Sequence, residues 1–558
     1  MSLAKVRKMN PRQLATDVLA KLNVSEICEK VEIAGAGFLN FRLKNSVLAL
    51  TLEAAARGEH LFFDKCGGDA SSPSGTATGA SRPRTVVIDF SSPNVAKPMH
   101  VGHIRSTGIG DALQRTLRLL GHRVISDNHI GDWGTQFGML LHGWSYLNPD
   151  KLKADPIGEM EWLYRKVNAA SVMDRGILEQ SRQALVELQS GNEERLKIWR
   201  EMIRLSQIQF DKIYSQLGVK FDQTLGESFY NPWLGEVVND LLGKKIARVS
   251  EGAVAVFSDS SLPPKEDPFL VNRDGEWIAD PALVRKSDGG FNYTTTDLAT
   301  IDYRLKTWSP DEIIYVVDDR QGSHFKKLFL IFARWQADAA KKVKLVHVGF
   351  GKIMGDDGKP FKTRSGDTVK LGDLLDEAET RALKIVSEKS PELPAAQKKE
   401  IARVIGLGAV KYADLLPNRQ SDYIFSWDKM LALQGNTAPY LQYAYARIKS
   451  IFRKSVQGAE IKDLSSVQLT AAEELALAKH LLNFGITLEA VADELRPNYL
   501  CNYLFELAGK FTSFYENCPV LKAEDEATRN SRLTLCALTA RVLKQGLETL
   551  GIEVVEQM

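Results

Sequence analysis

The chain has 558 residues, of which 44% are hydrophobic and 25% are charged, as expected for a soluble globular protein of about three or four domains. Its 72 lysines and arginines nearly balance 70 aspartates and glutamates, which argues against a protein that coats nucleic acid nonspecifically. The five cysteines are odd in number and far apart, so we expect reduced thiols, no disulfide framework and no metal site.

The N-terminal segment lacks the apolar core of a secretory signal, and no later apolar run approaches the ~20 residues that cross a bilayer. We therefore expect a cytoplasmic protein with no membrane partner. Residues 1–66 are predicted to form a small α+β unit, with a helix over Pro11–Leu22 and strands around a glycine turn in Val31–Leu43. Residues 67–84 are rich in Gly, Ser and Thr and are predicted to be a linker.

Residues 85–406 are predicted to form a doubly wound α/β domain of the Rossmann type. Thr85–Ser91 is a buried strand, His103–Leu120 a helix that Gly121 ends, and the stretch after Gly121 a second strand. Strand, loop, helix and strand make half of such a fold. A mainly helical insertion is expected over about 150–250. Sheet-like segments then resume at Ala253–Ser258, Asp311–Asp318 and Lys344–Phe350.

Two histidines three residues apart, His100 and His103, stand in the loop between the first strand and its helix. Ligands bind at this edge of a doubly wound sheet, and a helix N-terminus attracts phosphate. The imidazoles can donate hydrogen bonds to charge that grows on a phosphate, and Gly102 leaves room for a base or sugar. This HxGH pattern is typical of class I aminoacyl-tRNA synthetases and of nucleotidylyltransferases. The alternative is a pair of surface histidines in a turn.

A second motif is the glycine- and lysine-rich segment Gly351–Leu371 (GKIMGDDGKPFKTRSGDTVKL). A mobile cationic loop of this kind can close over a triphosphate and neutralise charge as pyrophosphate leaves. Taken alone, the segment is more typical of a solvated hairpin. Downstream of HxGH, it resembles the KMSKS loop of class I synthetases. Its polar side chains are Lys359, Lys362, Arg364 and Ser365.

Over essentially its whole length, the chain resembles the arginyl-tRNA synthetases. The stretches that carry the resemblance are VEIAGAGFLNFRL, DFSSPNVAKPMHVGHIRST, DNHIGDWGTQFGML, FNYTTTDLATIDYR, FKTRSG and LQGNTAPYLQYAYARIKSI. The resemblance implies an N-terminal module that contacts tRNA, a Rossmann catalytic domain and an α-helical anticodon-binding domain over 407–558. It also implies an arginine–tRNA ligase, whose partners are L-arginine, ATP with Mg²⁺, and arginine tRNA.

In this family, arginine and ATP give arginyl-adenylate and pyrophosphate, and the arginyl group then moves to the 2′-OH of the terminal adenosine. Family members generally need bound tRNA before they activate arginine. We expect this protein to be a monomer that carries out the same two-step reaction and also needs bound tRNA to activate arginine.

The resemblance also implies roles for individual residues. Asp297 would pair with the substrate guanidinium and Tyr293 would line the pocket; the two are one helical turn apart. Other contacts to arginine would come from Asp89, Ser92, Asn94 and Gln321. The catalytic group would be His100, His103, Lys97, Lys362 and Arg364, and ATP would also meet Gly102, His324 and Ser365. For His324, a helix-capping role is the alternative.

One departure from the class pattern concerns Arg364, which stands where KMSKS has its last lysine. Arginine keeps the positive charge, but its planar fork is not a compact ammonium. In this family a lysine ahead of HxGH, here Lys97, is thought to take over part of that role. The alternative for Lys97 is a solvent-facing side chain.

From about Leu407 the pattern is helical, and the LQGNTAPY stretch resembles the anticodon-reading loop of the family. Unpaired bases are read by stacking and edge hydrogen bonds, with basic groups on phosphates. The candidates are Gln434, Asn436, Tyr440 and Arg447. The alternative is an amphipathic helix whose tyrosines belong to the core.

Other functions fit less well. A cysteine ligase would need a zinc site, and a glutamate ligase would need a cationic pocket where NYTTTD offers Asp297. A non-catalytic RNA-binding relative should have lost HxGH or the cationic loop. A small-molecule nucleotidylyltransferase would not need the helical C-terminal domain.

Overall fold

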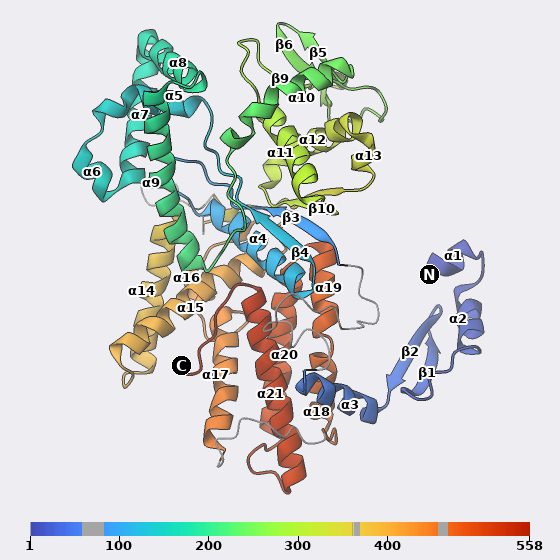
Figure 1. Ribbon diagram of the computed structural model, residues 1–558. Coiled ribbons are helices and arrows are strands. Elements are labelled where there is room, and N and C mark those ends of the chain that lie inside the picture. Colours follow the sequence, from blue (N-terminus) through green and yellow to red (C-terminus); the bar gives the residue numbers. More distant parts are fainter. Residues whose placement is uncertain (1, 59–82, 356, 360, 362–368, 456–466) are drawn as a thin grey trace.

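The structure is a computed structural model that describes residues 2–58, 83–355, 357–359, 361, 369–455 and 467–558. Figure 1 shows a central sheet with a large group of C-terminal helices below it. Inserted helices lie above the sheet on one side, and the N-terminal unit stands out from the body on the other.

The N-terminal unit has the predicted α+β composition. Asn10 caps its second helix, and Gly35 and Gly37 supply the positive φ angles of 52° and 118° that the hairpin turn requires. The third helix attaches the unit to the body, where Glu53 Oε1 accepts the backbone N–H of Val467 at 2.6 Å. The elements are α1 (Ser2–Val6), α2 (Pro11–Leu19), β1 (Cys28–Ala34), β2 (Phe38–Leu43) and α3 (Asn45–Ala56).

The central sheet is parallel, with the strand order β11-β10-β3-β4. Its strands are β3 (Thr85–Asp89), β4 (Arg123–Asp127), β10 (Glu312–Tyr315) and β11 (Lys344–His347). The β3 run is apolar and buried on both faces, as a sheet covered on both sides requires. The register pairs Asp89 with Asp127 and Tyr315 with Asp89, so three strands end side by side at the carboxyl edge. The predicted doubly wound sheet is confirmed.

Helices cover both faces of this sheet. On one face α4 (Gly102–Leu119) packs in the same core as Val86 and Ile88. On the other face α11 (Tyr293–Trp308) and α12 (Gly322–Trp335) share a core with Val87, and α13 (Ala337–Ala340) follows. A Cβ on Gly110 of α4 would lie 2.2 Å from the Phe90 ring, so glycine permits the close approach of this helix.

The insertion is mainly helical, as predicted. It contains α5 (Thr135–Gly143), α6 (Pro149–Ala154), α7 (Pro156–Met173), α8 (Arg175–Gln189), α9 (Glu193–Leu217) and, after the short 3₁₀ turn η2 (Glu227–Tyr230), α10 (Asn231–Gly243). The segment Ala253–Ser258 contributes β6 (Ala253–Val256), which lies outside the central sheet. It pairs antiparallel with β5 (Ala247–Ser250) and β9 (Ala282–Arg285), and β7 (Leu270–Arg273) pairs with β8 (Glu276–Ala279).

The C-terminal region is helical, also as predicted. The expected boundary at 406/407 falls inside one continuous helix, α15 (Ala395–Leu415). The other elements are α14 (Leu371–Lys389), α16 (Trp427–Met430), α17 (Ala438–Lys454), α18 (Ala472–Leu481), α19 (Phe484–Glu494), α20 (Asn498–Asn517), α21 (Glu526–Thr549) and the short strands β12 (Ile353–Met354) and β13 (Tyr423–Ile424).

Within the described ranges, one stretch, Ala472–Glu494, is long and apolar enough to cross a membrane. It is divided between α18 and α19, and half of it is buried in the fold. Four cysteines are buried free thiols, namely Cys28, Cys501, Cys518 and Cys536, whereas Cys66 lies outside the described residues.

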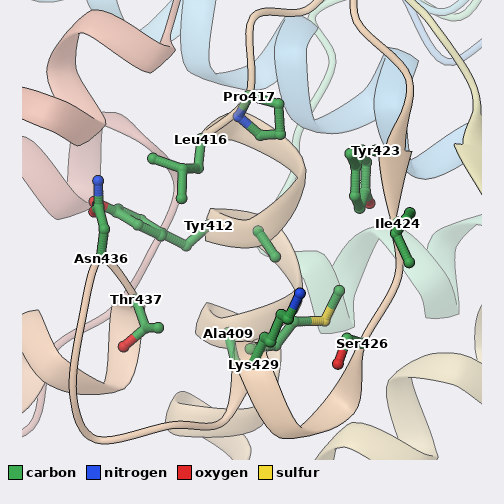
Figure 2. Close-up of a pocket in the computed structure, with 12 residues that line it drawn as sticks. Ala409, Tyr412, Leu416, Pro417, Tyr423, Ile424, Ser426, Lys429, Asn436 and Thr437 are labelled. Atoms are coloured by element: carbon green, nitrogen blue, oxygen red, sulfur yellow. The ribbon is translucent and has the colours of Figure 1, made fainter. Parts of the chain in front are cut away.

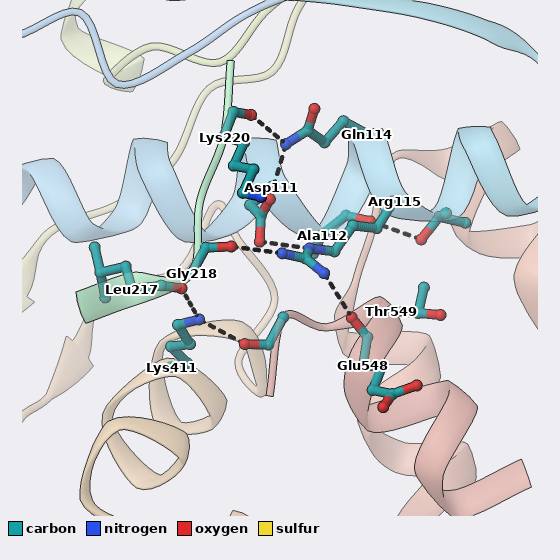
Figure 3. Close-up of polar contacts among 12 residues, drawn as sticks. Asp111, Ala112, Gln114, Arg115, Leu217, Gly218, Lys220, Lys411, Glu548 and Thr549 are labelled. Atoms are coloured by element: carbon teal, nitrogen blue, oxygen red, sulfur yellow. Dashed lines mark hydrogen bonds and ion pairs between the residues drawn. The ribbon is translucent and has the colours of Figure 1, made fainter. Parts of the chain in front are cut away.

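A buried polar junction joins α4 to the end of the chain (Figure 3). Arg115 pairs with Asp111 at 2.8 Å and donates to the carbonyl oxygen of Glu548 at 3.3 Å. Lys411 of α15 donates to the end of α9 and, at 2.5 Å, to the carbonyl oxygen of Gly551. Burial lowers the pKa of Lys411 to about 8. Residues separated by several hundred positions thus meet at one point.

Candidate active site

The HxGH motif lies between β3 and the first turn of α4, as predicted. His100 Nδ1 accepts the N–H of Gly102 at 3.1 Å, and His103 Nδ1 lies 3.0 Å from the N–H of His100. The ring centroids are 4.0 Å apart. Because His100 Nδ1 accepts a backbone hydrogen, the neutral His100 ring carries its proton on Nε2 and can donate it to a ligand. His103 Nδ1 also lies 3.2 Å from the carbonyl oxygen of His100, so either nitrogen of the His103 ring can carry its proton.

Both imidazoles are held in the neutral form. Burial, followed by the nearby charge of Arg320, lowers the pKa of His100. Burial and the neighbouring His100 lower the pKa of His103 to about 3. At neutral pH both rings are therefore uncharged, and the Nε2–H group of His100 is a donor that suits stabilisation of charge on a phosphate.

Both described ends of the cationic segment Gly351–Leu371 are anchored beside HxGH. Arg105, in the first turn of α4, donates to the carbonyl oxygen of Gly351 at 3.1 Å. At the other end, the backbone of Val369–Leu371 bonds to that of Met99–Val101, with N···O distances of 2.8 and 2.9 Å. The two motifs therefore converge on one edge of the sheet. Three predicted residues of the segment, Lys362, Arg364 and Ser365, lie outside the described residues.

Lys97 lines a cavity of about 210 Å³ between the HxGH loop, α9 and α14. Its ammonium group lies 5.3 Å from the centre of the Tyr164 ring, a cation–π contact. Lys212 and Lys370 line the same cavity, and Asp373 provides opposite charge there. The side chain is half-buried, so the solvent-facing alternative does not describe it.

Tyr293, Asp297 and His324 form one cluster. Tyr293 and Asp297 lie on the first two turns of α11, and His324 lies on α12. His324 Nε2 is 2.6 Å from Asp297 Oδ2, and the Tyr293 ring meets the His324 ring edge-on at 4.7 Å. The capping alternative for His324 is wrong because its side chain bonds across to α11. Gln321 precedes α12, is exposed and makes no side-chain cap.

Asp89 ends β3 and is already paired within the protein. Its carboxylate lies 2.5 Å from Nη2 of Arg304 and accepts the Ser92 hydroxyl at 3.1 Å. Asn94 follows in the same loop, is exposed and bridges to Gly131. Asp89, Ser92 and Asn94 therefore line the carboxyl edge of the sheet as predicted, but Asp89 shares its charge with an internal guanidinium.

Three family models match the chain. The catalytic domain of class I (R) tRNA synthetases matches residues 73–427, the DALR anticodon-binding domain matches 441–558, and the N-terminal domain of arginyl-tRNA synthetases matches 1–43. The chain belongs to the arginyl-tRNA synthetase family.

Similar proteins support the same family. An arginine–tRNA ligase from Enterobacter sp. (strain 638) is 45% identical over 562 residues, covering 100% of this chain and 92% of the relative. The arginyl-tRNA synthetase structure from Plasmodium falciparum has a TM-score of 0.79 at 30% identity, covering 98% of this chain and 89% of that one. The Thermus thermophilus structure has a TM-score of 0.79 at 26% identity, covering 100% and 93%.

Two residues of this synthetase, Arg304, which is buried, and Glu227, which is half-buried, escaped prediction. Arg304 lies on the same face of α11 as Asp297, seven positions later, and that helical spacing was visible in the sequence. Glu227 begins the η2 turn, and burial raises the pKa of its carboxyl group to about 7, with Asp297 and Asp132 adding to the rise. No sequence pattern identifies Glu227. This residue comes close to Asp297 and Asp132 only because the chain returns to the sheet after the inserted helices.

The loop predicted to read the anticodon lies before α17. Gln434 is exposed, whereas Asn436 accepts the Tyr412 hydroxyl at 2.5 Å. Asn436 also lines a cavity of about 190 Å³ bounded by α15, β13 and α16. Figure 2 shows Asn436 and Tyr412 pointing toward each other at one side of this cavity.

The predicted residues on α17 pack against α20. The ring centroids of Tyr440 and Phe505 are 5.7 Å apart, and the Arg447 guanidinium lies 4.7 Å from the Tyr515 ring. The core alternative holds for Tyr445, which is buried, but not for Tyr443, which is exposed. One face of α17 thus belongs to the core, and another remains available.

Proposed function

We propose the route by which this synthetase ligates arginine to its tRNA. In the first step the carboxylate of L-arginine attacks the α-phosphate of ATP, giving arginyl-adenylate and pyrophosphate. In the second step the 2′-OH of the terminal tRNA adenosine attacks the arginyl carbonyl and releases AMP. The observation that carries this proposal is the convergence of HxGH with both anchors of the cationic segment.

The HxGH loop serves the first step. The Nε2–H groups of His100 and His103 donate to the α-phosphate oxygens as negative charge grows there, and Gly102 lets the nucleotide approach the backbone. ATP enters as its Mg²⁺ complex, so the metal belongs to the substrate. Lys97 and the cationic segment, through Lys362, Arg364 and Ser365, neutralise the departing pyrophosphate.

The cluster on α11 and α12 receives the arginine side chain. A guanidinium is best met by carboxylates, and Asp297 offers one whose present partner is the His324 ring. On binding, the guanidinium takes that place, Tyr293 covers it, and His324 turns toward the adenosine. Asp89 and Gln321 add acceptors, and Ser92 and Asn94 meet the amino and carboxyl ends.

The C-terminal region holds the tRNA. The exposed loop around Gln434 and the free face of α17 contact the anticodon, with Asn436, Tyr440 and Arg447 contributing amide, aromatic and cationic groups. Arginine activation depends on bound tRNA, and the enzyme acts as a cytoplasmic monomer.

ATP–pyrophosphate exchange with each of the twenty amino acids, with and without tRNA, tests this route. We expect exchange with arginine alone, and only when tRNA is present. Exchange with another amino acid would overturn the specificity, and exchange without tRNA would overturn the dependence. Light scattering under the assay conditions gives the molar mass of the active species and so tests whether it is a monomer.

A further inference from the structure

Two carboxylates lie side by side at the floor of the site. Asp89 and Asp127 are register partners at the ends of adjacent parallel strands, and both side chains are buried. Two like charges so placed would repel each other strongly in a region that water does not screen. A single nitrogen, Nη2 of Arg304, bridges them at 2.5 and 2.8 Å.

Arg304 comes from the helix that carries the proposed arginine-binding residues. Its side chain is fully buried, and its guanidinium carbon lies 5.4 Å from the centre of the ring of Tyr315, the last residue of the next strand. Tyr293, Asp297 and Arg304 are spaced by four and seven residues, so they share one face of α11. Arg304 therefore joins this face to the ends of β3, β4 and β10.

This bridge ties α11 to the ends of β3 and β4. The HxGH loop continues directly from β3, whereas Asp297 and Tyr293 are carried by α11. A slip of α11 by one turn would move Asp297 by about 5.4 Å along the helix axis. Reacting atoms must meet within a few tenths of an ångström, and a misplacement of about 1 Å can cost about 100-fold in rate.

We propose that Arg304 is a positioning residue that sets the separation between the arginine pocket on α11 and the ATP site on the β3 loop. The proposal rests on the arginine site of the preceding section. Arg304 touches neither substrate; it acts through Asp89 and Asp127, which hold α11 in one rotation and one register against the sheet.

The test measures tRNA-dependent aminoacylation with L-arginine and with L-homoarginine, which is longer by one methylene. For Arg304→Gln we expect kcat/KM for arginine to fall about 100-fold and the preference for arginine over homoarginine to fall about tenfold, with KM for ATP changing less than about threefold. A purely structural role would lower the amount of folded enzyme without changing the preference.

Arg84→Gln is the matched control. Arg84 also pairs with a buried carboxylate of this sheet, Glu312 at 2.8 Å, but at the opposite, amino edge. Its loss should lower thermal stability and leave the preference between the two amino acids unchanged. An unchanged preference in folded Arg304→Gln would overturn the proposal.

A second variant covers the case in which Arg304→Gln does not fold because two carboxylates are left unpaired. Asp127→Asn keeps the Arg304–Asp89 pair and removes half of the bridge, so the preference for arginine over homoarginine should fall about threefold. An unchanged preference would overturn the proposal.

Asp297→Asn tests the proposed arginine site itself. An unchanged KM for arginine in Asp297→Asn would show that Asp297 does not bind the substrate side chain. That result would overturn the proposed arginine pocket independently of the outcome for Arg304→Gln.

Discussion

The carboxyl edge of the central sheet and the loop before α17 are built in opposite ways. At the sheet edge, residues separated by hundreds of positions meet through buried, short, charge-assisted bonds, as in the bridge from Arg304 to Asp89 and Asp127. In the loop before α17, the candidate residues come from one short stretch, and Gln434 is exposed. The sheet edge is therefore a preorganised site, whereas the loop offers groups that a large ligand can order.

This difference predicts where substitutions act. At a preorganised site, losing one group should slow the chemical step while binding changes little. At an exposed local surface, losing one group should weaken tRNA binding and leave the chemical step intact. The substitutions below test that division, beginning with the largest expected effect.

The first concerns His103. We expect His103→Ala to slow arginyl-adenylate formation by about 10²–10³-fold, since one preorganised donor to the transition state is lost. Rapid-quench measurement of adenylate with tRNA present gives the rate directly, and KM for tRNA should stay the same. His142→Ala, which alters a histidine of the insertion that contacts Tyr146, is the control and should change the rate less than about twofold.

The second concerns Lys97. We expect Lys97→Ala to reduce adenylate formation by about 100-fold, on the scale of one strong electrostatic contact. Lys212→Ala removes a like charge from another wall of the same cavity and serves as the control. A loss of less than about threefold for Lys97→Ala in pyrophosphate exchange would refute the role assigned to this lysine.

The third concerns Tyr440, a half-buried residue in the first turn of α17. Tyr440→Ala should raise KM for tRNA about tenfold with kcat nearly unchanged, because stacking on a base contributes about 1–3 kcal/mol. Tyr445→Phe is the companion variant, since it removes a buried hydroxyl that bonds to Glu556 at 2.8 Å without altering the surface. It should lower the unfolding temperature and leave KM for tRNA unchanged. A fall in kcat alone for Tyr440→Ala would contradict the proposed division.

The smallest effect is a pH dependence of stability at the sheet edge. Burial raises the pKa of Glu227 to about 7, so the folded chain binds this proton more tightly than the unfolded chain, whose glutamates titrate near pH ~4.3. Between these values stability falls as pH rises, and above pH 7 the folded protein carries the full cost of a buried carboxylate.

Glu227→Gln removes that cost. Its unfolding temperature relative to the wild type should therefore be higher at pH 8 than at pH 5, by about 1–3 °C in differential scanning fluorimetry. Glu236→Gln, at an exposed position of α10, should show no such trend. A difference that is the same at both pH values would mean that Glu227 ionises normally in the folded chain.

Local patterns accounted for much of the fold. The apolar run of β3, the spacing within α4 and Gly121 after it were sufficient to place the HxGH loop at the edge of a parallel sheet. The position of Tyr293 and Asp297 on one helix face likewise followed from their spacing. In each case the determining contacts lie within one element or between neighbours in sequence.

The remainder depended on contacts between distant segments. No local pattern shows that His324 bonds to Asp297, that Asp89 is paired with Arg304, or that Ala253–Val256 leaves the central sheet. Such pairings are decided by which helix covers which strand. Periodicity along the chain does not carry that information, so it could not distinguish capping from cross-helix bonding for His324.

The junction around Lys411 and Arg115 has a consequence for how the nucleotide site is supported. The carbonyl oxygens that these side chains bond belong to Gly551 and to Glu548 near the end of α21. Excision of residues 549–558 would leave the buried Lys411 ammonium with one acceptor fewer, a loss of about 1–3 kcal/mol. The packing behind the HxGH helix therefore depends on a segment that lies 433 positions from Arg115.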